Sequence, residues 1–285
     1  MATTSTTALV QDVTVAHSPD SDDAFMFYGL ATNKVRVPGL KFSHTLCDIE
    51  TLNRKAMDGV YDVSAISFHA YPYVQEKYAL LSSGGSVGEG YGPMIVANRK
   101  FSVNEIKEIR LAIPGTLTTA YLVLRLFAPR VETVVVPFDQ IIPRILEGRY
   151  DAGLIIHEGQ LTYSRSGLHR IVDLGKWWRD MTGFPLPLGG NVIRRDLQPE
   201  VIKSVALALK NSIQYALDHR EEALAYAMQF ARDLDAQSAD KFVGMYVNER
   251  TVDYGAEGRE AVRRLLDMGY EAGIIPHPAK VDFVS

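Results

Sequence analysis

The chain has 285 residues, of which 47% are hydrophobic and 22% are charged, and its formal net charge is −4. This composition is typical of a globular protein, and the length predicts about two domains of roughly 150 residues each, or one large domain. The slight negative balance and the lack of a Lys/Arg cluster give no reason to expect nucleic acid as a partner.

The single cysteine, Cys47, excludes a disulfide within the chain. The first residues, MATTSTTALVQDVTVA, contain neither a basic segment nor a continuous apolar run, so no signal peptide is expected. No window approaches ~18 consecutive apolar residues, so no membrane span is expected either. We therefore expect a cytoplasmic protein. The sequence does not indicate its oligomeric state.

Strands and helices alternate along the first two thirds of the chain. The predicted strands are 13–18, 41–47, 62–68, 93–98, 110–114, 131–138, 152–156, 169–175 and 187–195. The predicted helices between them are 22–33, 48–57, 118–127 and 141–148. Such alternation is typical of a parallel or mixed sheet with helices on both faces.

Helical patterns dominate the last third of the chain. They cover residues 198–218, 220–231, 235–248 and about 256–272. A helical tail of this length is expected to pack back on the first lobe. This predicts a two-lobed α/β architecture. Residues 1–98 and 191–285 would form lobe one and residues 99–190 lobe two, with chain crossings near Ala97–Lys100 and Gly189–Asn191.

The glycine-rich segment GGSVGEGYG (84–92) invites comparison with phosphate-binding loops. It matches neither G-x-G-x-x-G nor G-x-x-x-x-G-K-[ST], and a predicted strand follows it instead of a helix. We therefore interpret it as a shaped loop at a pocket or between lobes.

Three carboxylates cluster in the segment PDSDDAF (19–25), namely Asp20, Asp22 and Asp23. Three carboxylates are able to hold Mg²⁺. However, they stand between a strand and an apolar helix, where Asp is a favoured cap and first-turn residue. Capping is the preferred interpretation, in a loop that is still expected to line a cleft.

The segment PGTLTTAYL (114–122) places Thr118 and Thr119 between a strand and an apolar helix. Hydroxyls together with the N–H groups that begin a helix suit a carboxylate or a phosphate. An ordinary N-cap needs only one such hydroxyl. Both interpretations, cap and ligand contact, remain open at this point.

His157 follows the predicted strand 152–156, at an edge where α/β proteins form crevices. No second His or Cys stands at metal-ligand spacing, so no metal site is predicted. The chain also lacks G-x-S-x-G, which argues against a Ser-His-Asp triad. Two alternatives are left: a half-buried structural histidine, or a lone general base, since imidazole titrates near neutrality.

Several segments together resemble the 1,4-dihydroxy-6-naphthoate synthase family, which acts in the futalosine route of menaquinone biosynthesis. They are DIETLNRKAMDG, SSGG-x-x-G-x-GYGP, IPGTLTTAYL, DAGLIIHEGQLTY, VDLGKWW and TGFPLPLGG. The resemblance runs from about residue 13 to the C-terminus. Its most specific parts are IIHE and LPLG.

The resemblance implies a periplasmic-binding-protein-like (type II) fold with a ligand cleft between two lobes. It implies a lyase that converts cyclic dehypoxanthine futalosine, a small carboxylated precursor, into 1,4-dihydroxy-6-naphthoate without a cofactor. By the same resemblance, His157 is the proton acceptor. Substrate contacts fall on Thr118 and Thr119 and on Ala65, Ile66 and Ser67.

The chain departs from the family at two places near the expected cleft. The family motif S-P-C-P-N-D is here Ser18–Asp23, and a lysine common at the position of Ala65 is absent. Three alternatives therefore stand beside the main hypothesis. They are a related enzyme of the chorismate dehydratase type, a solute-binding protein of an uptake system, and a ligand sensor without catalytic activity.

Overall fold

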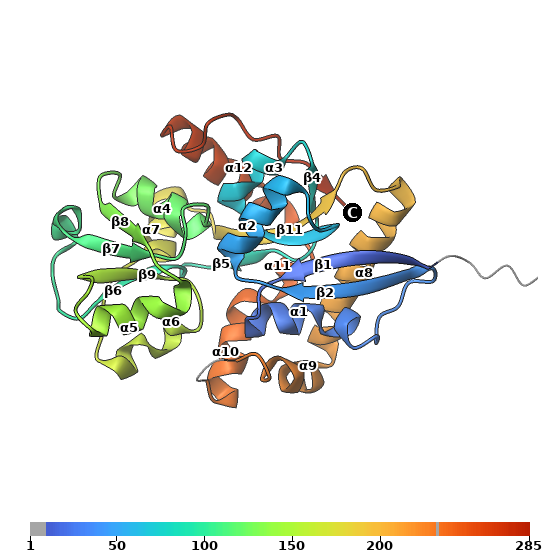
Figure 1. Cartoon of the computed structure of the whole chain (residues 1–285), viewed down its shortest axis with the longest axis horizontal. Helices are drawn as coiled ribbons and strands as arrows, with labels where there is room; N and C mark the ends of the chain where they lie inside the picture. The colour runs from blue at the N-terminus through green and yellow to red at the C-terminus, as the bar shows by residue number, and fades with distance from the viewer. Residues whose placement is uncertain (1–9, 232–233) are drawn as a thin grey trace, which may run out of the picture.

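The computed structural model describes residues 10–231 and 234–285, and these form two lobes that lie side by side (Figure 1). Each lobe is built on its own β-sheet. One sheet has the strand order β12-β4-β11-β3-β1-β2, with β5 paired to β11, and the other has the order β10-β6-β9-β7-β8. The predicted two-lobed α/β architecture is therefore confirmed. Within the described residues, no helix has the length and apolarity needed to cross a membrane.

The first lobe contains both ends of the described chain. Its strands are β1 (Gln11–His17), β2 (Leu40–Leu46), β3 (Val63–Ser67), β4 (Tyr78–Leu81), β5 (Ser86–Gly88), β11 (Leu186–Arg194) and β12 (Phe283–Val284). Its helices are α1 (Ser21–Ala31), α2 (Ile49–Asp58), α3 (Tyr71–Val74), α8 (Pro199–Asp218), α9 (Arg220–Ala227), α10 (Ala236–Tyr246), α11 (Glu249–Val252) and α12 (Gly255–Glu271). Strand β1 runs parallel to β2 and β3, and β11 runs antiparallel to β3 and β4. The mixed sheet predicted from the alternating elements is thus present.

The second lobe is built from the middle of the chain. Its strands are β6 (Met94–Ala97), β7 (Arg110–Ile113), β8 (Glu132–Val135), β9 (Ala152–Ile155) and β10 (His169–Asp173). Its helices are α4 (Thr119–Phe127), α5 (Ile141–Leu146), α6 (Gly159–Thr162) and α7 (Leu174–Thr182). Strand β7 is parallel to β8 and β9. The loops that leave β7 and β9 therefore emerge at the same edge of the sheet.

The sheet pairing shows where the chain passes from one sheet to the other. Strand β6, which the predicted boundary at residue 98 assigns to lobe one, pairs with β9 and β10 of the second sheet. The chain therefore leaves the first sheet after β5, and it has already returned when β11 begins at Leu186. The division into lobes at the predicted residue numbers stays a prediction.

The crossing segment packs tightly against the start of α7. The Leu174 N–H donates to the Pro93 carbonyl at 2.9 Å. A Cβ atom on Gly175 would lie 2.1 Å from the carbonyl carbon of Tyr91. Only glycine fits where two stretches of backbone approach so closely.

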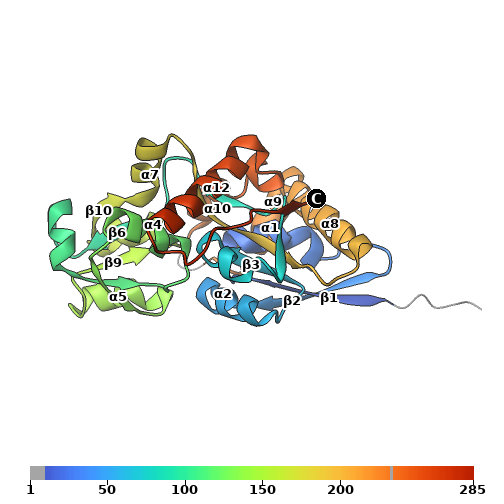
Figure 2. The ribbon, with the colours of Figure 1, turned by 90° about the horizontal axis from the view of Figure 1, so that it is seen from above.

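Helix α12 joins the two lobes. It packs on β11 and on the short 3-10 helix η1 (Phe68–Ala70) of the first lobe, and also on α4 of the second (Figure 2). The buried side chains of Leu265 and Leu266 belong to one apolar cluster with Ile66 of the first lobe and Leu122 of the second. The lobes therefore share a continuous core at this seam.

Replacing Gly175 with Ala is expected to lower the free energy of unfolding by about 2 kcal/mol, because the added methyl group meets backbone that cannot give way. The matched control is Gly244→Ala in α10, where the nearest atom to an added Cβ is the mobile end of Arg220 at 3.3 Å. The control should be neutral or gain up to about 1 kcal/mol, since alanine favours helix. Urea denaturation of both variants checks this. Equal stability of the two variants would contradict the packing described for the crossing.

Candidate functional site

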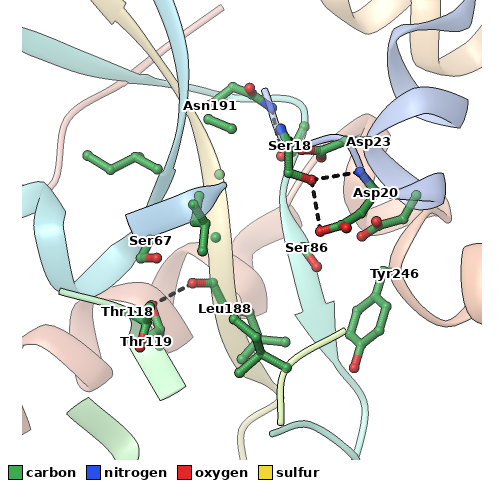
Figure 3. Close-up of a pocket in the computed structure, with 18 of the residues that line it drawn as sticks. Ser18, Asp20, Asp23, Ser67, Ser86, Thr118, Thr119, Leu188, Asn191 and Tyr246 are labelled. Carbon is green, nitrogen blue, oxygen red and sulfur yellow. Dashed lines mark hydrogen bonds between the residues drawn. The ribbon is translucent and has the colours of Figure 1, made fainter. Parts of the chain in front are cut away.

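A pocket enclosing about 810 Å³, part of it open to solvent, lies where the lobes meet (Figure 3). Its walls come from the ends of β1, β3 and β9, from the first turns of α1 and α4, and from α10. Small-molecule sites are found preferentially in concave pockets between domains. The pocket is therefore the candidate functional site.

Five of the six residues predicted for the site line this pocket. Ala65, Ile66 and Ser67 form the end of β3, while Thr118 and Thr119 begin α4. Strand β3 and helix α4 belong to different lobes, so the structure brings these residues together across the seam. Whether they contact a substrate stays a prediction.

The two threonine hydroxyls at the start of α4 hold the backbone in place. Thr118 Oγ1 accepts the N–H of Tyr121 as an N-cap and donates to the Gly115 carbonyl, both at 3.1 Å. Thr119 Oγ1 donates to the Leu188 carbonyl. The first N–H groups of a helix have no partner within the helix, and those of Thr119 and Ala120 begin α4 at the pocket wall. An anion is therefore best bound by these N–H groups, with the hydroxyls fixing their position.

Two buried residues of α2 fasten this loop to the first lobe, and the sequence analysis missed both. Asn53 accepts the Ser67 N–H at 2.8 Å and donates to the Ser67 hydroxyl at 3.0 Å and to the Leu117 carbonyl at 3.4 Å. Glu50 accepts the Leu117 N–H at 3.1 Å. A Cβ on Gly115 would lie 2.2 Å from the Glu50 carboxylate, so glycine is required there. One signal in the sequence could have identified Asn53. It stands four residues after Ile49, so a polar side chain lies on the predicted apolar face of this helix.

The acidic segment forms the other end of the pocket. Asp20 is the N-cap of α1, but its side chain makes no capping hydrogen bond and instead accepts the Ser18 hydroxyl at 3.1 Å. Asp23 accepts the Ser18 N–H at 2.7 Å. Asp20, Asp22 and Asp23 all line the pocket. Asp20 occupies the N-cap position and Asp22 and Asp23 the first turn, as predicted, although the Asp20 side chain makes no capping hydrogen bond. The prediction that this loop lines a cleft is confirmed.

Burial raises the pKa values of two of these carboxyl groups, those of Asp22 and Asp23. The pKa of Asp23 rises to about 6, although the N–H of Ser18 opposes the shift. The pKa of Asp22 is raised well above its usual range, by burial first and then by the charges of Asp23, Asp20 and Glu158. Within the described residues, no three His, Cys, Asp or Glu side chains are placed as metal ligands. The cluster is thus a crowded group of carboxyls and lacks the geometry of a magnesium site.

His157 is half-buried and lies next to the pocket, directly after the pocket-lining Ile156. Its Nε2 lies 3.2 Å from the Phe138 carbonyl, and its Nδ1 accepts the Gly159 N–H at 3.1 Å. Because a carbonyl only accepts, Nε2 carries the proton and the imidazole is neutral in this arrangement. His157 is not part of the pocket wall itself, and its role as a base stays a prediction.

The turn after β9 also contacts the first lobe. Glu158 accepts the Ser21 hydroxyl at 3.1 Å, and Gln160 accepts the Tyr246 hydroxyl at 2.8 Å. Glu158 and Gln160 of the turn are buried, and so is Ser21 of the first lobe. The contacts therefore fix the distance between His157 and the acidic end of the pocket.

Comparison with known proteins identifies close relatives. A family model described as menaquinone biosynthesis matches residues 13–271. The chain is 42% identical over 249 residues to 1,4-dihydroxy-6-naphthoate synthase of Thermus thermophilus, covering 87% of this chain and 90% of that protein. It is 38% identical over 269 residues to the enzyme of the same name from Streptomyces coelicolor, covering 92% and 94%.

Solved structures agree on the fold. A protein from Archaeoglobus fulgidus superposes with a TM-score of 0.89 at 45% identity, over 93% of this chain and 98% of that one. A Candida albicans protein described as having the generic periplasmic binding protein fold gives a TM-score of 0.68 at 15% identity, over 95% and 93%. The fold is therefore periplasmic-binding-protein-like, as the resemblance implied.

The raised pKa of Asp23 predicts a pH-dependent stability. A carboxyl whose pKa is about 6 in the folded state, against 3.8 as its ordinary value, destabilises the fold increasingly as pH rises from about 4 to about 6, and by a constant full amount above that. Asp23→Asn keeps an acceptor for Ser18 and should raise the free energy of unfolding at pH 8 by up to about 2 kcal/mol, with no gain at pH 4. Thermal unfolding at both pH values measures this, with exposed Asp267→Asn as control. A gain that is the same at both pH values would contradict the assignment.

Proposed function

The chain belongs to the menaquinone-biosynthesis family, and we propose that it is itself a 1,4-dihydroxy-6-naphthoate synthase. The proposed reaction is carbon–carbon cleavage of cyclic dehypoxanthine futalosine to 1,4-dihydroxy-6-naphthoate. The observation that carries the proposal is the pocket between the lobes, with the beginning of α4 at one end and His157 beside it. A cytoplasmic location, which the sequence predicts, is part of the proposal.

The pocket suits a ring system with one carboxylate. The N–H groups of Thr119 and Ala120 would hold the carboxylate, aided by the positive end of the α4 dipole. Apolar side chains of Ile66, Ile156 and Leu188 line the space next to these groups. A flat bicyclic acid would thus be bound by its charged end and packed along its faces.

His157 is proposed to take the proton that starts the reaction. The neutral imidazole is held by the Phe138 carbonyl and the Gly159 N–H. To accept a proton, the ring has to exchange one of these backbone contacts for the substrate, because Nε2 carries the proton and the lone pair of Nδ1 faces Gly159. His157 directly follows Ile156, which lines the pocket, so the exchange would turn the ring towards the ligand.

The chemistry needs positioning and proton transfer. His157 removes a proton bound to carbon or oxygen, and the electron pair left behind drives cleavage of the carbon–carbon bond to the sugar-derived fragment. The ring that remains becomes aromatic, which makes the step downhill. The protein therefore contributes mainly a fixed substrate orientation and a positioned base.

The proposed function is tested by incubating the purified protein with cyclic dehypoxanthine futalosine and measuring 1,4-dihydroxy-6-naphthoate by mass spectrometry. Appearance of the naphthoate in proportion to enzyme concentration supports the proposal. Folded protein that yields none overturns it. Tight binding without conversion would then identify a solute-binding protein.

Replacing His157 with Asn should lower kcat by about 10²–10⁴-fold, the usual contribution of a general base. KM should change little, because the carboxylate contacts lie on α4. The control is His277→Asn, which alters an exposed histidine. Circular dichroism confirms that both variants are folded. A His157→Asn enzyme with wild-type kcat would remove His157 from the mechanism.

A further inference from the structure

The pocket is electrostatically one-sided. Its lining contains Asp20, Asp22 and Asp23 but, within the described residues, no Lys, Arg or His. The three carboxylates gather at the end opposite Thr118 and Thr119, as Figure 3 shows for Asp20 and Asp23. The positive end of α4 is therefore the place for an anionic group, and the far end disfavours a second one.

The acidic end also contains a buried hydrogen-bond acceptor without a partner. Asn191 is 1% exposed and lines the pocket, and its Oδ1 has no hydrogen-bond partner within the described residues. Its Nδ2 donates to the Gly84 carbonyl at 3.0 Å, which fixes the orientation of the amide. Buried acceptors are normally satisfied, so this oxygen indicates a ligand that donates a hydrogen bond.

A second buried oxygen near this end is also unsatisfied. Glu158 Oε2 has no hydrogen-bond partner in the described part of the chain, while Oε1 accepts from Ser21. Burial and the charge of Asp20 raise the pKa of Glu158, and Asp22 is affected in the same direction. The unsatisfied Glu158 oxygen is therefore a second acceptor that a hydrogen-bond donor would satisfy.

Hydroxyl groups meet these requirements. Each hydroxyl donates one hydrogen bond and also accepts, so it satisfies Asn191 Oδ1 or a carboxylate and can pair with the hydroxyls of Ser18 and Ser86. Ser86 lines the same pocket as Asp20, and both are labelled in Figure 3. A phosphate or a second carboxylate would offer only acceptors to a wall of acceptors and would be repelled.

We propose that Ser18, Asp20, Ser86 and Asn191 form a subsite for an uncharged, hydroxyl-bearing part of the ligand, and that this subsite excludes a second anion. This deepens the proposed function, on which it rests for the identity of the substrate. The carboxylate binds at α4, and the sugar-derived fragment that leaves during the reaction binds at the acidic end.

The exclusion of a second anion is tested with two probes that do not depend on turnover. Calorimetric titration compares 2-naphthoate with 2,6-naphthalenedicarboxylate, which carries a carboxylate at both ends. The wild-type protein should bind 2-naphthoate at least about tenfold more tightly, because the second carboxylate meets the acidic end. In Asp20→Asn the difference in affinity between the two probes should shrink, while Asp267→Asn should keep it.

A dicarboxylate that binds wild type as tightly as 2-naphthoate, or an unchanged difference in Asp20→Asn, overturns the exclusion of a second anion. Failure of both probes to bind overturns the placement of a carboxylated ring in this pocket.

The hydroxyl subsite is tested by comparing substrate with product. Ser86→Ala and Asp20→Ala should raise KM for cyclic dehypoxanthine futalosine about tenfold, as expected for lost hydrogen bonds that involve a charged group. The Kd for 1,4-dihydroxy-6-naphthoate, which lacks the sugar-derived fragment, should stay within about twofold of wild type. A parallel rise of KM and Kd, or no rise in KM, overturns the subsite while the proposed function stands. A wild-type enzyme without turnover overturns the proposed function, and the naphthoate probes still decide the exclusion.

Discussion

The pocket depends on the attachment of one loop of the second lobe to a helix of the first. Residues 115–117 connect β7 to α4, and Glu50 and Asn53 of α2 bind them through the N–H and the carbonyl of Leu117. Asn53 simultaneously binds the backbone and the hydroxyl of Ser67, at the end of β3. One fully buried amide therefore sets the position of both pocket walls, and a small-molecule site needs walls at a fixed separation.

Further contacts between the two lobes also hold the pocket walls in place. The N–H of His69 donates to Thr119 Oγ1 at 3.3 Å, and burial lowers the pKa of this histidine to about 4, so its ring is neutral at physiological pH. Helix α12 packs on both lobes, within one continuous apolar cluster. Opening the cleft would separate part of that cluster and expose apolar surface, which is unfavourable. The fold of a binding protein is here stabilised in an arrangement that favours precise positioning over exchange of solute.

The sequence was sufficient to predict most of the elements, although not β4, β5 or β12, and much of the pocket wall. Strand ends in α/β proteins lie at crevices, and this rule alone places Thr118 and Thr119 at the site. The sequence was not sufficient where a strand or a side chain pairs with residues that its local pattern does not identify. The apolar run of β6 does not reveal which sheet it joins, and the side chain of Asp20 binds Ser18 instead of capping α1. Asn53 and Asn191 act through residues far away in the chain, and a local pattern carries no information on those contacts.

The acidic end of the pocket is unfavourable for stability, and this points to function. Crowded carboxyls with raised pKa values and an unsatisfied Asn191 oxygen are features that selection for stability alone removes. The pocket wall formed by β3 brings no charge to balance this end, and Ala65 there is 7% exposed and lines the pocket. The beginning of α4 provides the positive end of the pocket, so a ligand with one anionic group and an uncharged remainder is the best electrostatic match.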